Sequence, residues 1–230
     1  MKPFIIFLQL FLPVVLFSQN KSVFKYKIAS TVFDMHKILE EEFGKKMEDK
    51  FSMEGGVLGN APMYISLLGF KDGREGASSE QKMEKTPSIS TCFVENGKMI
   101  LGNAIGFMSG VAVSIEMNTA DSTYIPKIVF NSDGVKAGKL KLDDEYIADL
   151  EVPFKEVSLE FSSDVDFKNG GTITGKLFGK SMEFYMQKNS PQGYEVVQLD
   201  VLSIFKCTLE DIQQEMLQME MMEEGQEKKH

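Results

Sequence analysis

The segment SISTCFVENGKMILGNAIGFMSGVAVSIEM, residues 88–117, indicates the fold more clearly than any other part of the chain. Its centre is Asn96-Gly97, a dipeptide that favours the positive φ angles of a two-residue type I′ β-hairpin. Apolar residues flank this turn on both sides, and the turn predicts that Glu95 lies opposite Lys98. The same register pairs Val94 with Met99, Phe93 with Ile100, and Cys92 with Leu101.

A third strand is predicted after Gly106, because apolar and more polar residues alternate there with the two-residue period of a strand. One face carries Val111, Val113, Ile115 and Met117, and the other carries Ala112, Ser114 and Glu116. Three strands in succession predict the start of an antiparallel sheet.

Turn signals recur along residues 88–205, and this spacing favours an antiparallel fold over alternating strands and helices. Further strands are predicted at 22–32, 123–130, 146–152, 157–161, 172–178, 182–186 and 194–205. Pro126 predicts an edge strand or a bulge, and Pro153 is expected to end the strand before it. The predicted fold class is therefore mainly β, an antiparallel sandwich or a partly open barrel.

Two amphipathic helices are expected to accompany the sheet. Asp34 is a predicted N-cap for a helix near residues 34–50, whose apolar stripe is Met35, Ile38, Leu39, Phe43 and Met47. Thr208 is a predicted cap for a helix from 208 to about 223. Its stripe is Leu209, Ile212, Met216 and Met219. Docking of that stripe would leave Met221, Met222 and a polar tail available for self-association.

The first 18 residues resemble a bacterial Sec-type signal peptide, with one lysine, an apolar core and a small residue before a polar run. The domain organisation expected is a signal peptide (1–18), an antiparallel β domain (19–207) and a C-terminal helix with a polar tail (208–230). The expected location is the bacterial periplasm or the extracellular space, with no membrane span after cleavage and no lipid anchor.

The net charge of −9 argues against nucleic-acid binding, which requires clustered basic residues to neutralise phosphates. Cys92 and Cys207 are the two cysteines of the chain, and the sequence leaves open whether they form a disulfide or two buried thiols. The polar stretch 71–87 is expected to be an exposed loop, either disordered or a contact surface.

Catalytic, cofactor and metal sites are not predicted. The histidines are His36 and His230, too few for a histidine-based constellation. Asp164, Asp166 and Asn169 are better explained as a turn than as a calcium loop. The methionines after residue 215 could bind Cu(I), but a helical apolar stripe explains them more simply.

These observations predict an exported, non-enzymatic binding or structural module of unknown ligand. The alternative is a periplasmic carrier of an apolar, lipid-like ligand, held in a curved sheet under a helical lid. The expected partner is an unknown protein or an apolar small molecule. The volume and lining of any cavity would separate the two hypotheses.

Overall fold

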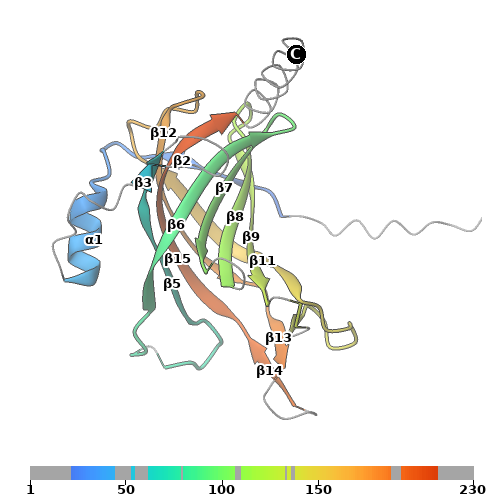
Figure 1. Cartoon of the computed structure of the whole chain (residues 1–230). Helices are drawn as coiled ribbons and strands as arrows, with labels where there is room; N and C mark the ends of the chain where they lie inside the picture. The colour runs from blue at the N-terminus through green and yellow to red at the C-terminus, as the bar shows by residue number, and fades with distance from the viewer. Residues whose placement is uncertain are drawn as a thin grey trace, which may run out of the picture.

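The structure is a computed structural model that describes residues 22–44, 53–54, 62–78, 80–106, 110–132, 134–135, 138–187 and 193–211. Eight strands form a closed barrel in the spatial order β9, β8, β7, β6, β5, β15, β12 and β11, and β11 pairs again with β9 (Figure 1). These strands are β5 (Ile65–Asp72), β6 (Glu84–Glu95), β7 (Lys98–Ile105), β8 (Gly110–Asn118), β9 (Thr123–Asn131), β11 (Asp149–Phe161), β12 (Thr172–Ser181) and β15 (Leu199–Asp211). The mainly β, antiparallel prediction is confirmed, and the sheet closes on itself instead of forming a sandwich.

The predicted hairpin between β6 and β7 is confirmed. Asn96 and Gly97 have φ angles of 51° and 75°, and all four predicted residue pairs are present. The alternation predicted for the third strand is also found in β8, where Val113, Ile115 and Met117 are buried.

The same alternation continues around the barrel and fills its lumen with side chains. Inward-facing residues of all eight strands pack into one cluster, which includes Leu68, Cys92, Leu101, Ile115, Ile128, Val152, Phe161, Leu177 and Phe205. An eight-stranded barrel is just wide enough for side chains to fill it. The centre of the domain is therefore a packed core.

Pro153 does not end its strand as predicted, whereas Pro126 lies where β9 has a partner strand on one side only, in line with the predicted edge. Pro153 lies inside β11, which continues through a bulge between Phe154 and Glu156. Pro126 lies inside β9 and pairs with Ile115 of β8. Both are tolerated because β9 and β11 pair with each other no further than Lys127 and Pro153, so the two strands separate there.

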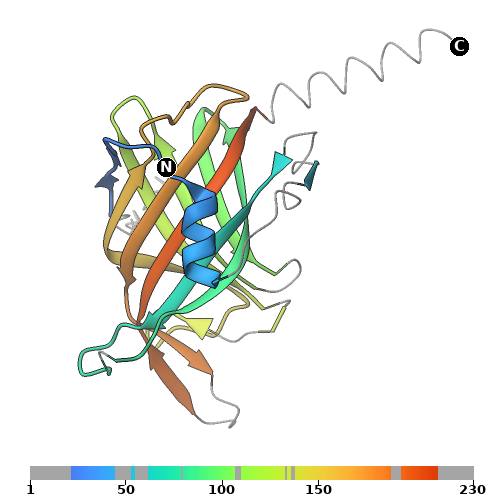
Figure 2. The ribbon, with the colours of Figure 1, turned by 90° about the vertical axis from the view of Figure 1, so that its left-hand side faces the viewer.

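Helix α1 (Met35–Phe43) begins as predicted, with Asp34 Oδ1 accepting the Lys37 N–H at 3.1 Å. It is shorter than the predicted 34–50, because Gly44 adopts the left-handed conformation and ends the helix. The helix lies on the outer wall of the barrel (Figure 2). Met35 and Leu39 pack there against Leu67 of β5 and Ile204 of β15.

The predicted C-terminal helix is wrong at its start, because residues 208–211 are the end of β15. Leu209 faces the core, and β15 pairs in parallel with β6 at Cys92–Leu209. The two-residue alternation of Val201, Ser203, Phe205 and Cys207 continues through Leu209 and overrides the capping signal at Thr208. Residues 212–230, with the rest of the predicted stripe, lie outside the described residues, and α1 is the single helix among those described.

A small sheet of β10 (Gly138–Lys139), β13 (Phe184–Gln187) and β14 (Tyr194–Val197) lies at one end of the barrel (Figure 1). The Phe184 ring lies 5.2 Å from that of Phe130 in β9. A second sheet pairs β3 (Met53–Glu54) with β4 (Pro62–Met63). The predicted signal peptide lies outside the described residues. None of the described helical structure is long and apolar enough to cross a membrane.

Candidate functional site

The barrel wall has a seam where β9 and β11 separate. A segment from the N-terminal part of the chain, residues 22–29, fills this seam, and we call it the strap. Its strand β1 (Phe24–Lys25) pairs antiparallel with β9, and its strand β2 (Lys27–Ile28) pairs in parallel with β11. The strap therefore acts as a short ninth strand that joins the two edges of the seam.

The strap is anchored by its inward-facing aromatic residues. The centre of the Phe24 ring lies 5.8 Å from the centre of the Tyr124 ring, and the centre of the Tyr26 ring lies 5.2 Å from that of Phe161. Two backbone hydrogen bonds also hold the strap. The Tyr26 N–H donates to the Ser122 carbonyl oxygen at 3.2 Å, and the Ala29 N–H donates to the Phe161 carbonyl oxygen at 2.8 Å. Since side chains alternate along a strand, Lys25 and Lys27 are left on the exposed side.

Tyr124 also spans the seam from the inside. Its hydroxyl donates to the Val157 carbonyl oxygen at 3.5 Å, which links β9 to β11 beyond the point where their backbones stop pairing. Burial raises the pKa of the Tyr124 hydroxyl, since the charged form would lose its hydration. This position indicates a structural role for the tyrosine.

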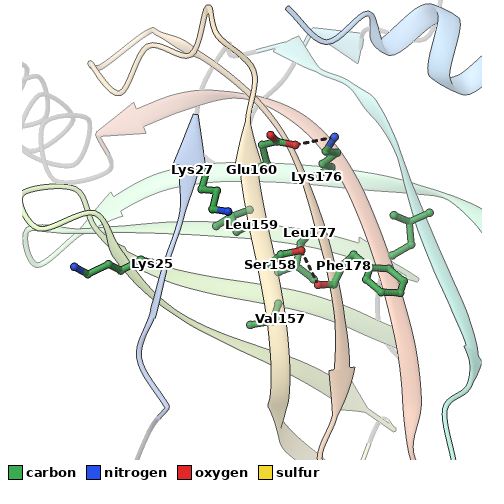
Figure 3. A pocket seen from close by; sticks show the side chains of 10 residues that line it. Lys25, Lys27, Val157, Ser158, Leu159, Glu160, Lys176, Leu177 and Phe178 are labelled. Atoms are coloured by element: carbon green, nitrogen blue, oxygen red, sulfur yellow. Dashed lines mark hydrogen bonds and ion pairs between the residues drawn. The ribbon is translucent and has the colours of Figure 1, made fainter. Parts of the chain in front are cut away.

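A pocket of about 390 Å³ lies beside the seam, between the strap and the outer face of β11 and β12, and we call it the strap pocket. Its polar lining consists of Lys25, Lys27, Ser158, Glu160 and Lys176. Its apolar lining consists of Val157, Phe178 and Leu202, together with the core residues Leu159 and Leu177, which are almost fully buried. In Figure 3, Lys27 extends from the strap toward β11, and Phe178 lies on the side of β12 that faces β15.

The charges of the strap pocket are partly compensated. Lys176 Nζ lies 2.7 Å from Glu160 Oε2 and 4.7 Å from the centre of the Phe33 ring. Neither Lys25 nor Lys27 has an ion pair with another described residue. Three lysines against one glutamate, 3 − 1, leave the pocket with a net charge of +2. The strap pocket is therefore a basic site on an acidic chain.

A second polar cluster lies inside the barrel and has a structural explanation. Asn103 Nδ2 donates to Ser203 Oγ at 2.8 Å and to the Leu67 carbonyl at 3.1 Å. Ser66 Oγ accepts the Lys206 N–H at 3.2 Å and contacts Ser90 Oγ at 2.5 Å. This cluster lies beside the first residues of β5, where that strand enters between β6 and β15. Its side chains bind backbone groups that would otherwise have no hydrogen-bond partner on a neighbouring strand.

The residues considered from sequence for chemistry are not brought together. His36 is exposed on α1. Asp166 Oδ1 accepts the Lys168 N–H at 3.1 Å, as expected of a turn, whereas Asn169 Oδ1 accepts the N–H of Asp211 at the end of β15, at 3.2 Å. His230 and the methionines after residue 215 lie outside the described residues. Among those described, no three His, Cys, Asp or Glu side chains are grouped so as to hold a metal ion.

The stretch 71–87 is shorter as a loop than predicted, because β5 extends to Asp72 and β6 begins at Glu84. Arg74 bonds to Asp72 and to the Val196 carbonyl, which ties this loop to β14. The side-chain hydrogen bonds from Arg74 hold the pKa of Asp72 below its usual value. The sequence predicts an exposed loop here, either disordered or a contact surface, and does not predict the strap pocket, whose one local signal is the alternation of Phe24 and Tyr26 with Lys25 and Lys27.

Comparisons of the chain with protein-family models, with curated proteins and with solved structures find no match.

Proposed function

We propose that this chain is a non-enzymatic binding module that holds a small molecule in the strap pocket. The observation that carries this proposal is the pocket itself, about 390 Å³ in volume and lined by both apolar side chains and lysines. Ligand sites typically occupy ~300 to 1,000 Å³ and combine an apolar lining with a few polar groups.

The rigidity of the surrounding wall supports this assignment. The lining comes from the strap, β11, β12 and β15, and β12 pairs with both β11 and β15 along most of its length. A site built on paired strands is held in place without the binding of a ligand. The strap pocket is therefore a more favourable place for a ligand than the barrel lumen, whose inward side chains pack together in one cluster.

We also propose that the protein works outside the cytoplasm. Residues 1–18 have the pattern of a secretory signal peptide, and oxidising compartments favour disulfides such as Cys92–Cys207. The alternative hypothesis, a carrier of an apolar ligand, is retained with the ligand placed in the strap pocket. Helix α1 packs on the outer face of β15, which points away from the lumen. Catalysis is not part of this proposal.

Native mass spectrometry of the protein purified without delipidation tests the proposal. Ser158→Trp places a large ring in the strap pocket, whereas Glu156→Trp places the same ring on the same outward face of β11 but outside the pocket lining. We expect a small-molecule adduct on the unmodified protein and on Glu156→Trp, and its loss from Ser158→Trp. An adduct that survives Ser158→Trp, or the lack of any adduct, would contradict the assignment.

A further inference from the structure

We propose that the ligand of the strap pocket is an amphipathic anion with one acyl chain and one carboxylate headgroup. In this arrangement Lys27 binds the carboxylate at the strap, and the acyl chain lies across β11 toward Phe178 and Leu202. Lys25 adds a second positive charge on the strap but extends away from β11 in Figure 3. The inference rests on the proposed function, because it names the chemical class of the molecule held at that site.

The charge of the pocket indicates an anion. The chain as a whole carries −9, yet the strap pocket has an excess of two positive charges. Lys176 is already paired with Glu160 at 2.7 Å, so the excess lies on the two strap lysines. Lys27 is the nearer of the two to β11 in Figure 3, and a lysine on a flexible stem binds a compact monoanion as a point charge.

The apolar half of the pocket indicates a hydrocarbon chain. Phe178 is 55% exposed although it lies on a central strand of the barrel wall. It stands directly opposite Leu202 in the pairing of β12 with β15, so the two side chains form one apolar surface. An acyl chain placed there would remove this surface from water, which is the main source of affinity for such ligands.

The dimensions of the pocket favour one chain over two. Its volume of about 390 Å³ is near the lower end of the range for small-molecule sites. The two lysines outside the Lys176–Glu160 ion pair are on the strap, whereas Phe178 is on β12 and Leu202 is on β15. A molecule with a charged end and an apolar end matches this division.

Isothermal titration of the purified protein with dodecanoate, below its micellar concentration, tests the inference. Dodecan-1-ol has the same chain without the charge and is the ligand control. Lys25→Gln/Lys27→Gln removes the strap charges, whereas Lys82→Gln/Lys141→Gln makes the same change in charge at exposed lysines that do not line the pocket. We expect dodecanoate to bind roughly tenfold more weakly to the first variant than to the second, at low ionic strength.

The apolar half is tested with Phe178→Ala, for which Tyr194→Ala on β14 is the control at another exposed aromatic residue. We expect Phe178→Ala to weaken dodecanoate binding and Tyr194→Ala to leave it unchanged. Equal affinity for dodecanoate and dodecan-1-ol, or equal affinity of the two lysine variants, would overturn the carboxylate assignment. If Ser158→Trp still removed the natural adduct in that case, the proposed function would stand and only the ligand class would be wrong.

Discussion

Cys92 and Cys207 form a disulfide that joins β6 to β15 across 115 residues of sequence. Their Cα atoms are 5.7 Å apart, within the ~4.4 to 6.8 Å range of disulfides. On β15 the pairing with β5 ends at Ile204 and the pairing with β6 begins at Leu209, so Cys207 lies between the two. The bond therefore fixes the strands between which β5 is inserted, and it answers a question that the sequence left open.

Removing this bond should lower the stability of the barrel. For Cys92→Ala/Cys207→Ala we expect the free energy of unfolding to fall by about 2 to 5 kcal/mol, because the bond closes a long loop in the unfolded chain. Urea unfolding followed by circular dichroism measures this change. A reductant should destabilise the unmodified protein and leave the double variant unaffected; equal stability of the oxidised protein and the variant would contradict the prediction.

Tyr124→Phe tests the inner side of the seam. At neutral pH the loss should be below ~1 kcal/mol, because the 3.5 Å hydrogen bond to Val157 is long. At alkaline pH the unmodified protein should lose stability as pH rises above about 10, the ordinary pKa of tyrosine. The sign follows from burial, which raises the folded pKa, so that the unfolded chain loses this proton first.

Urea midpoints measured between pH 8 and pH 11 for both proteins isolate the contribution of Tyr124, since the other titrating groups are shared. The unmodified protein should show the steeper decline above pH 10, and Tyr124→Phe the shallower one. Parallel declines would mean that the hydroxyl is not buried in the folded state.

Gly175→Ala tests the packing of the lumen. An added Cβ would lie 2.6 Å from Phe205 Cζ and 3.0 Å from Phe161 Cδ1, inside a filled core. Overpacking of this kind costs roughly 1 to 3 kcal/mol. We expect Phe205→Leu to recover part of that loss when combined with Gly175→Ala, and a double-mutant cycle by thermal unfolding would measure the coupling. Additive effects of the two changes would argue against their contact.

Leu39→Ala tests the docking of α1 on the outer wall. Leu39 is 6% exposed and packs with Leu67 and Ile204, so its truncation should cost about 2 kcal/mol or more. Glu41→Ala on the same helix is the control, because its ion pair with Lys37 is exposed and contributes little. If both variants unfolded at the same urea concentration, α1 would not contribute to the stability of the barrel.

The sequence alone predicts the structure correctly where it depends on residues that are close together in the chain. The register from Cys92–Leu101 to Glu95–Lys98 follows from the two residues of one turn, and Asp34 begins its helix by bonding three residues ahead. The same local reasoning failed at Thr208, where pairing with β6 and the disulfide hold the chain as a strand. Local capping signals are weak compared with such tertiary contacts.

Barrel closure and the strap pocket could not be predicted in this way. Closure depends on the pairing of Leu150 with Phe130, and the pocket combines residues as far apart as Lys25 and Leu202. A single sequence shows the period of each strand but not which strands meet. The polar stretch 71–87 predicts an exposed loop, either disordered or a contact surface, because it lacks an apolar period, whereas the strap pocket lies on residues that look like ordinary alternating strands.

The location of the ligand is the central claim, and it is tested most directly by two-dimensional ¹H–¹⁵N NMR of the protein titrated with dodecanoate. We predict that the largest shift changes occur at the amides of Lys27, Ser158 and Phe178, in a single saturable process. Changes confined to lumen strands around Val113 and Ile115, or no changes while the ligand is in excess, would contradict the assignment of the strap pocket as the binding site.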